Sequence, residues 1–155
     1  MITTKNGDQG MTSLKDERVS KFDCRIDSLG NLDETMAAII YLQSQIDSIY
    51  EEELRAIVVD LTSICSLIAK YPSELDESRL LWLEAKIKEY EDFNESFHFS
   101  YPFNQPKNAL CNMVRSIVRR SERSLLNTKV INHEIVIAYM NRLSDYFFVL
   151  SKQKL

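Results

Sequence analysis

Hydrophobic residues recur at helical spacing along most of the chain from Asn31 onward. The stretch 31–50, NLDETMAAIIYLQSQIDSIY, opens with acidic residues, which stabilise the N-terminal turn of a helix. Its apolar positions fall mostly three or four residues apart, as on one face of a helix: Leu32, Met36, Ile39, Ile40 and Leu42. This pattern predicts a first helix that begins near Asn31.

Four further segments carry a comparable pattern. EEELRAIVVDLTSICSLIAKY, residues 51–71, predicts a second helix that ends at Pro72, because proline cannot continue a helix. Further helices are expected at 74–95, about 107–126 and about 132–151. The stretch FHFSYPFNQPKN at 97–108 contains two prolines and is expected to be a non-helical connection. Five long helices with almost no strand signal predict an all-α protein, a five-helix bundle.

Residues 1–30 differ from the rest of the chain. They contain all three glycines and many Thr, Ser, Asp and Lys residues, without sustained apolar periodicity. We therefore expect an ordered loop there rather than a helix. A chain of 155 residues is most simply one domain, 1–155, with a loop at 1–30 and a helical bundle at 31–155.

Composition narrows the classes of protein to consider. Hydrophobic residues make up 45% and charged residues 27%, which is ordinary for a globular protein in water. No apolar run approaches the roughly 18 residues of a membrane span, and the N-terminus lacks the pattern of a signal peptide. We expect a cytoplasmic protein that is not bound to a membrane.

The cysteines and histidines do not indicate a metal site. Three widely spaced cysteines without a C-x-x-C pair are typical of unpaired thiols in a reducing compartment. Cys65 and Cys111 lie in apolar helical context and are expected to be buried. His98 and His133 have no ligand spacing to each other or to a cysteine. A metal site built by the protein alone is not expected.

The most unusual stretch is RSIVRRSER at 115–123, with four arginines in a chain of net charge −4. On a helical wheel the core face is predicted to hold Leu110, Met113, Val114, Ile117 and Ser121. Arg115, Arg119 and Glu122 share a second face, and Arg120 and Arg123 lie on a third. One interpretation is a solvated charged face, which contributes little to stability. The other is an anion site, because arginine presents a planar, permanently charged fork to phosphate or carboxylate.

The kind of anion follows from the rest of the chain. An arginine-rich helix can bind a nucleic acid backbone, but no further basic stripe accompanies this one, so nucleic acid is not expected. A small polyanion such as a nucleoside triphosphate suits a compact cluster better. The N-terminal TTKNGDQGMTSL, residues 3–14, is of the type that cradles phosphate, although it lacks the Walker A spacing and such glycines also occur in ordinary turns.

The last predicted helix contains polar residues within an apolar stretch. In AYMNRLSDYFFVL, residues 138–150, Asn141, Asp145 and Phe148 share one face. The two polar side chains are either surface groups or partners in hydrogen bonds to another helix.

Taken in order, five segments of the chain resemble the PduO-type ATP:cob(I)alamin adenosyltransferases. The segments are TTKNGDQGMTSL, RVSKFDCRIDSLGNLDE, FSYP, RSIVRRSER and MNRLSDYFFVL. The corresponding family patterns are T-K-T-G-D-x-G-x-T, R-V-x-K-x-D-x-R-V-x-A-Y-G-x-x-D-E-L, F-V-L-P-G-G, R-x-x-C-R-R-A-E-R and L-N-R-L-S-D-x-L-F. The resemblance implies a five-helix bundle that assembles as a homotrimer with active sites between subunits. It also implies transfer of the 5′-deoxyadenosyl group of ATP to the cobalt of cob(I)alamin, with release of triphosphate and use of Mg²⁺.

The resemblance also implies roles for particular residues. The ATP loop would consist of Thr4, Lys5, Gly7, Asp8, Gly10 and Thr12, with Lys21 reaching the phosphates. Arg115 would pair with Asp33 across the subunit interface, and ATP with its metal would be held by Arg119, Glu122 and Asn141. Phe99 would lie against the lower face of the corrin ring. A flavoprotein reductase and a cobalamin-dependent enzyme are the protein partners that this chemistry implies.

This implied reaction explains the charge pattern. Arginines fixed around the departing triphosphate would stabilise its developing negative charge. Co(I) is itself the nucleophile, so no general base is needed and the absence of a Ser-His-Asp or Cys-His arrangement is expected. An aromatic side chain that excludes the lower axial ligand would leave Co(II) four-coordinate and easier to reduce.

Several positions depart from the family pattern. Asn6 replaces a threonine of the loop, Leu29 a tyrosine, and Thr35-Met36 the usual Leu-Asn. The family's P-G-G becomes Pro102-Phe103-Asn104, so the corrin-side loop is expected to be bulkier and differently bent. This change favours one alternative, a non-catalytic relative that binds ATP or cobalamin as a sensor or carrier. A structural helical module without ligand is a third interpretation, which leaves the arginines unexplained.

Overall fold

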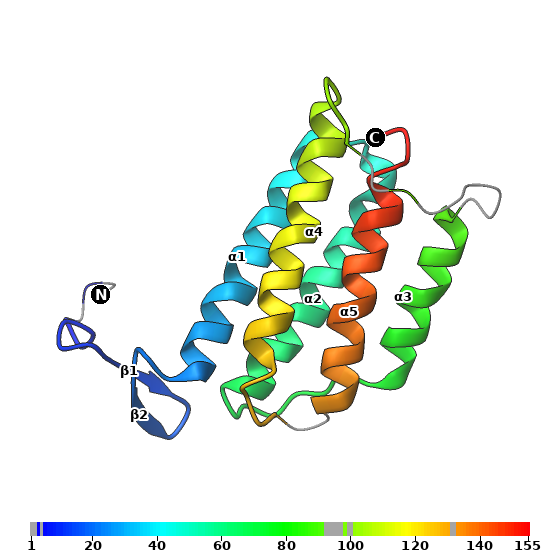
Figure 1. The fold of residues 1–155 in the computed structure, drawn as a ribbon. Helices are drawn as coiled ribbons and strands as arrows, with labels where there is room; N and C mark the ends of the chain where they lie inside the picture. The colour runs from blue at the N-terminus through cyan, green and yellow to red at the C-terminus, as the bar shows by residue number, and fades with distance from the viewer. Residues whose placement is uncertain (1–2, 4, 92–97, 99–100, 131–132) are drawn as a thin grey trace.

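Five α-helices and one β-hairpin make up the structure, a computed structural model that describes residues 3, 5–91, 98, 101–130 and 133–155 (Figure 1). The hairpin strands are β1, Met11–Leu14, and β2, Glu17–Ser20. The helices are α1, Cys24–Gln45; α2, Glu51–Ile68; α3, Glu77–Tyr90; α4, Pro106–Leu125; and α5, His133–Leu150. A short 3₁₀ turn, Ser48–Tyr50, precedes α2. The five predicted helices are confirmed, and Thr4 and Phe99 lie outside the described residues.

The N-terminal region is where the sequence prediction was wrong. An antiparallel hairpin forms in place of a loop, with Leu14 paired to Glu17 and Thr12 to Val19. Leu14 and Val19 are both buried, so the hairpin has an apolar side of its own. Helix α1 then begins at Cys24 rather than Asn31, because the side chain of Asp23 caps it by accepting a hydrogen bond from the Arg25 backbone N–H.

Other helix ends differ by smaller amounts. Helix α3 begins at Glu77, since Asp76 is its N-cap and accepts from the Arg79 backbone N–H. Helix α4 begins at Pro106, whose missing N–H costs nothing at the first helical position. Residues 74–76, which the predicted helix at 74–95 included, therefore lie before the helix.

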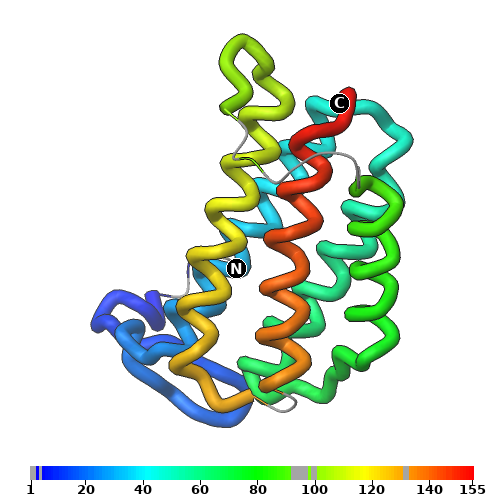
Figure 2. The backbone as a smooth tube through the Cα atoms, turned by 45° about the vertical axis from the view of Figure 1, so that its right-hand side comes forward, coloured from blue at the N-terminus to red at the C-terminus, as the bar shows by residue number. Residues whose placement is uncertain are grey.

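The helices run along one another in a bundle (Figures 1 and 2). Helix α1 packs against α2 and α4, α4 packs against α5, and α3 packs against α5. The hairpin lies at the end of the bundle where α1 begins and α4 ends. The opposite end holds the end of α3, the start of α4 and the C-terminus. No helix in the described part of the chain has both the length and the apolar character that crossing a membrane requires.

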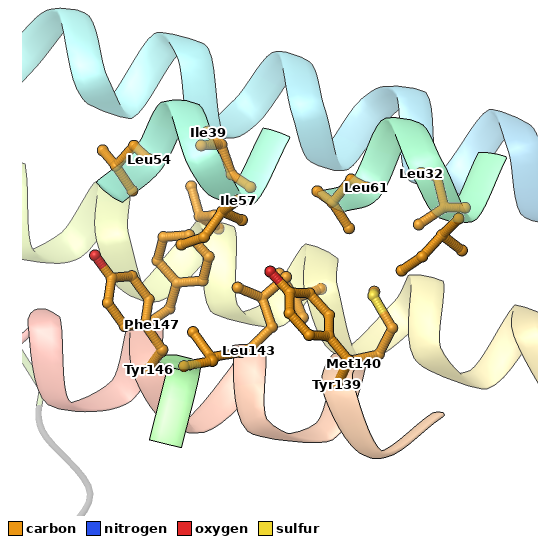
Figure 3. Packing of buried hydrophobic residues seen from close by; sticks show 14 of the residues in the cluster. Leu32, Ile39, Leu54, Ile57, Leu61, Tyr139, Met140, Leu143, Tyr146 and Phe147 are labelled. Atoms are coloured by element: carbon orange, nitrogen blue, oxygen red, sulfur yellow. The ribbon is translucent and has the colours of Figure 1, made fainter. Parts of the chain in front are cut away.

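The core lies between α1, α2, α4 and α5 (Figure 3). Fully buried aromatic side chains from α5, Tyr139, Tyr146 and Phe147, face aliphatic residues of α1 and α2. The Tyr139 hydroxyl donates to Asp60 at 2.6 Å, and Asp60 also pairs with Arg79 of α3 at 2.8 Å. A buried carboxylate with these partners fastens α3 to α2 and α5, because leaving it unpaired in the core would be costly.

The core face of α4 differs from the predicted one. Its buried residues are Cys111, Val114, Val118, Ser121 and Leu125. Met113 was assigned to the core and is 50% exposed, while Leu110 and Ile117 are only partly buried. Val114 and Ser121 are buried as predicted, and the Ser121 hydroxyl meets that of Thr35 in α1. Cys111 is buried as predicted, whereas Cys65 is only partly buried.

Candidate active site

The N-terminal loop, defined here as residues 5–10, folds into consecutive turns in front of β1. The Asp8 N–H donates to the Lys5 carbonyl at 3.3 Å, and the Gly10 N–H donates to the Gly7 carbonyl at 3.2 Å. Lys5 and Gly10 both adopt positive φ, at 58° and 74°. The Lys21 N–H closes the loop by donating to the Gly10 carbonyl at 2.8 Å. The loop therefore returns to the end of β2 instead of extending into solvent.

Gly7 of this loop lies beside Lys21, and both residues were predicted to bind ATP. A methyl group added at Gly7 would lie 3.1 Å from the Lys21 Nζ atom and 3.4 Å from its Cε atom. The absence of a side chain at Gly7 thus leaves room for the Lys21 ammonium group. Thr12 lies just beyond the loop, in β1. The predicted loop residues other than Thr4 thus lie in the N-terminal loop or in β1 directly after it, with the ammonium group of Lys21 beside Gly7.

An ionic cluster that the sequence analysis did not identify anchors the hairpin. The Arg25 guanidinium binds Glu17 at 2.6 Å and Asp23 at 2.8 Å, and Lys70 binds Glu17 at 2.8 Å. Hydrogen bonds from Arg25 and Lys70 lower the pKa of Glu17 from 4.5 to about 2. Hydrogen bonding from Arg25 likewise lowers the pKa of Asp23 to about 2. The sequence did contain one indication of this cluster: Asp23, the N-cap of α1, stands two residues before Arg25.

The arginines of α4 divide into distinct environments. Arg115 is partly buried, and its Nε atom donates to Asn112 at 2.7 Å. Burial, together with the nearby charge of Arg119, lowers the pKa of Arg115. Arg119 is exposed one turn further on. Among the described residues no carboxylate lies within ion-pair distance of either, so both charges are available to an anion from outside the chain.

The other two arginines have partners within the chain. Arg120 forms an ion pair with Glu34 of α1. Arg123 lies in the last turn of α4 and donates to the Arg119 carbonyl at 3.1 Å, an arrangement that suits the negative end of a helix. Half of the basic cluster therefore stabilises the bundle or the end of α4.

Glu122 of α4 and Asn141 of α5 meet across the two helices. The Asn141 side-chain amide donates to Glu122 Oε1 at 3.3 Å. Arg142 also holds this amide in place, because it donates to Asn141 Oδ1 at 3.1 Å. Arg142 binds Asp145 at 2.7 Å as well. Glu122 and Asn141 supply oxygen ligands of the kind that Mg²⁺ prefers. The described residues contain no group of three or more His, Cys, Asp or Glu side chains that could hold a metal alone.

Asp33 and Arg115, the predicted partners, do not meet within one chain. Asp33 is exposed on α1 and lies toward α2, where its charge and, more strongly, burial raise the pKa of Cys65 to about 11. The adjacent Glu34 instead faces α4, where it binds Arg120. Asp33 and Arg115 thus belong to different faces of the protomer.

The sequence matches the cobalamin adenosyltransferase family over residues 2–153. The chain belongs to this family. It is 31% identical to the corrinoid adenosyltransferase of Bacillus subtilis, over 97% of this chain and 84% of that protein. Identity is also 31% to the corrinoid adenosyltransferase PduO of Salmonella typhimurium, of which the chain spans 48%.

Solved structures of the family share the fold. A variant PduO-type ATP:co(I)rrinoid adenosyltransferase from Lactobacillus reuteri, complexed with ATP, superposes with a TM-score of 0.86 at 28% identity, over 97% of this chain and 92% of that one. A second variant from the same organism, complexed with cobalamin and ATP, gives a TM-score of 0.88 at 27% identity, over 97% and 89% of the two chains.

Comparison with the family pattern explains one departure in the turn before α4. Asn104 occupies the second glycine position of P-G-G and adopts φ of 62°. Asparagine is among the few residues other than glycine that adopt this left-handed conformation readily. The Gln105 N–H donates to the Pro102 carbonyl at 3.2 Å, which completes a turn just before α4. The expected bulkier loop is present at Phe103, which is 83% exposed, and Asn104 gives the turn its positive φ.

A second departure is explained by a contact between two helices. Thr35 and Ser121, which stand where the family pattern has Leu and Ala, are fully buried, and their hydroxyl oxygens lie 2.7 Å apart. Ser121 also donates to the Asn31 carbonyl at 2.8 Å. The hydroxyl pair replaces an apolar contact at the crossing of α1 and α4.

Proposed function

We propose that this chain transfers the 5′-deoxyadenosyl group of ATP to the cobalt of cob(I)alamin. The observation that carries the proposal is the retention, within this family's fold, of exposed Arg119 and partly buried Arg115, neither paired with a carboxylate of the described chain. Relatives with 27–28% identity form complexes with ATP or with cobalamin and ATP.

The nucleotide half of the site would consist of the N-terminal loop and the arginine face of α4. Lys5, Gly7, Asp8, Gly10 and Thr12, together with Thr4, would surround the phosphates. Lys21 would place its ammonium group on them from beside Gly7. Backbone N–H groups in such a tight loop are suited to bind anions.

The chemical step needs charge stabilisation more than proton transfer. The electron pair of Co(I) attacks C5′ of ATP, the C5′–O bond breaks, and triphosphate leaves with that bonding pair. Cobalt is formally oxidised from Co(I) to Co(III), and no proton has to be moved. Arg119 would stabilise the charge that develops on the departing triphosphate, since a cation that is already in place needs no reorganisation as the bond breaks.

Glu122 and Asn141 would hold Mg²⁺ together with the phosphates of ATP. Their oxygen ligands suit this ion, which usually binds through one or two carboxylates and substrate phosphates. The ion would supply charge neutralisation along the triphosphate.

We propose that the site is completed by a second copy of the chain in a homotrimer. In one protomer the hairpin and the connection into α4 lie at opposite ends of the bundle (Figure 1). A helix of 20 residues such as α4 spans ~30 Å, so another copy must bring the two halves together. Asp33 and Arg115, which face different ways in one chain, would then pair between subunits and satisfy the partly buried guanidinium.

An apolar surface between α1 and α2 supports this assembly. Ile40 and Val59 are 56% and 64% exposed, and they line a groove of about 320 Å³. Clustered apolar exposure of this kind usually marks a surface that another protein covers. The groove lies between α1, which carries Asp33, and α2, toward which Asp33 lies.

The cobalamin half would lie at the connection between α3 and α4. Phe99, in this connection, would cover the lower face of the corrin and exclude an axial ligand from Co(II). Replacing Phe99 by Ala should then impair the reaction from Co(II) more than the reaction from pre-reduced Co(I). Equal loss from both starting states would contradict this role.

The test is anaerobic incubation with ATP, Mg²⁺ and chemically reduced cob(I)alamin, followed by the absorbance spectrum. Light-sensitive adenosylcobalamin formed only with both enzyme and ATP is the expected result. ATP binding without product would instead favour a sensor or carrier, and would direct attention to Pro102-Phe103-Asn104.

A further inference from the structure

Arg142 of α5 contacts three side chains, two on its own helix and one on α3. Its Nη1 atom donates to Asn141 Oδ1 at 3.1 Å and to Asp145 Oδ2 at 2.7 Å. Its Nε atom lies 3.3 Å from Glu84 Oε1 of α3, the helix that packs against α5 (Figure 1). The short contact with Asp145 holds the guanidinium on α5, because hydrogen bonds between charged groups are the strong ones. The contact with Glu84 links the same group to α3.

The Asn141 side chain is contacted at both ends of its amide group. Arg142 donates to the amide oxygen, and the amide nitrogen donates to Glu122 Oε1 at 3.3 Å. A guanidinium has N–H donors and no acceptor, whereas an ionised carboxylate has acceptors and no donor. The amide oxygen must therefore face Arg142, and the amide nitrogen must face Glu122. Only one of the two orientations of this amide satisfies both neighbours.

The orientation of Asn141 depends on these neighbours, because the last torsion of an asparagine side chain is loosely defined by itself. If the amide turned over, its oxygen would face the Glu122 carboxylate and its N–H groups would face the Arg142 guanidinium. Both contacts would then be repulsive. The amide in turn restrains Glu122, since it is bonded to one of the two carboxylate oxygens. Arg142 thus acts on Glu122 of α4 through Asn141.

We propose that Arg142 is a positioning residue for nucleotide binding: it orients the Asn141 amide and, through that amide, the Glu122 carboxylate. This inference rests on the proposed function, in which Asn141 and Glu122 hold the phosphates of ATP together with Mg²⁺. Arg142 itself touches neither the nucleotide nor the ion.

The test is a double-mutant cycle that measures the Kd for ATP in the presence of Mg²⁺ by calorimetry, without cobalamin. Arg142 is only partly buried, so Arg142→Gln should leave the fold intact. This variant should raise the Kd by about five- to tenfold, because the amide loses the partner that orients it. In a chain that also carries Asn141→Ala, the same substitution should change the Kd by less than about twofold, since the residue through which Arg142 acts is gone. An equal rise in both backgrounds would mean that Arg142 acts by its charge or through the fold, and would overturn the inference.

Glu84→Gln is the matched control. It removes the ion pair between α3 and α5 and leaves Arg142 with its contacts to Asn141 and Asp145. The Kd for ATP should stay within about twofold of the wild type. A rise as large as that in Arg142→Gln would assign the effect to the link between the helices and would also overturn the inference.

The remaining outcomes separate this inference from the proposed function. An unchanged Kd in Arg142→Gln would overturn the inference alone. If the wild type bound ATP but formed no adenosylcobalamin, the proposed transfer would fail while the cycle still decided the role of Arg142. If the wild type bound no ATP, both would fail.

Discussion

The two ends of the helix bundle are stabilised by different kinds of contact. At the proposed nucleotide end, the hairpin is fixed to α1 by charged groups, with Arg25 binding Glu17 and Asp23. At the proposed corrin end, neutral amide groups link α3, α4 and the residues after α5, with Asn108 and Gln153 donating to backbone carbonyls.

Two of the charged contacts that fix the hairpin join residues two or eight positions apart, whereas the third joins Lys70 to Glu17 from a distant part of the sequence. The neutral contacts at the corrin end join residues 45 and 63 positions apart. Where distant neutral contacts hold an end of the bundle in place, the residues of that end can differ from the family pattern, as Phe103 and Asn104 do. The contacts that hold it then form no local sequence motif.

The largest expected effect tests the nucleotide end. Replacing Arg119 by Ala should reduce adenosylation by roughly a hundredfold or more, because a positioned charge on the departing group is lost. The melting temperature should hardly change, since Arg119 is exposed. Arg123→Ala removes a similarly exposed arginine one turn further on and should cost much less. Activity like that of the wild type in Arg119→Ala would contradict the assignment of phosphate binding.

A smaller effect is expected inside the loop. Gly7→Ala would place a methyl group 3.1 Å from the Lys21 Nζ atom and displace the ammonium group. We expect the KM for ATP to rise by about tenfold with little change in stability. Gly30→Ala is the control: Gly30 lies in α1 with open space around it, so alanine should stabilise the helix by about 0.5–1 kcal/mol. An unchanged KM for ATP in Gly7→Ala would separate the glycine from nucleotide binding.

The ionic anchor of the hairpin should give a pH-dependent contribution to stability. Glu17 and Asp23 have folded-state pKa values lowered to about 2, so their stabilisation is present above the ordinary values of 4.5 and 3.8. It is lost as the pH falls toward 2. The difference in melting temperature between the wild type and Arg25→Ala should therefore be largest near pH 6–7 and shrink in acid. A difference that stayed constant from pH 7 to pH 2.5 would rule out this anchor.

The smallest effect concerns the turn at the corrin end. Asn104→Ala should cost about 1 kcal/mol of folding free energy, because alanine is strained at φ of 62°. Asn104→Gly should be nearly neutral. Both free energies can be measured by urea unfolding. Equal stability of the two variants would show that the left-handed turn is not needed.

Sequence alone predicts the five helices, while the roles of the site residues stay predictions that follow from the family resemblance. The helices follow from apolar periodicity, and Gly7, Lys21, Glu122 and Asn141 follow from motifs whose partners the fold then brings together. The hairpin was missed because each strand has only four residues, too few for alternation to be visible. The contacts of the residues after α5 were missed because nothing in their composition indicates a contact with Tyr90 or Asn108. Such contacts depend on how the helices pack.

The central claim is that one protomer carries two separated halves of the site and needs a second copy. The most direct measurement is the adenosylation rate of mixed trimers, made by co-expressing Asp33→Ala and Arg115→Ala chains with different affinity tags and purifying through both. In every mixed trimer one of the three interfaces pairs an intact Asp33 with an intact Arg115, so about a third of the wild-type rate should return. Each variant alone should be nearly inactive. A mixed preparation no more active than the separate variants would contradict a site shared between subunits.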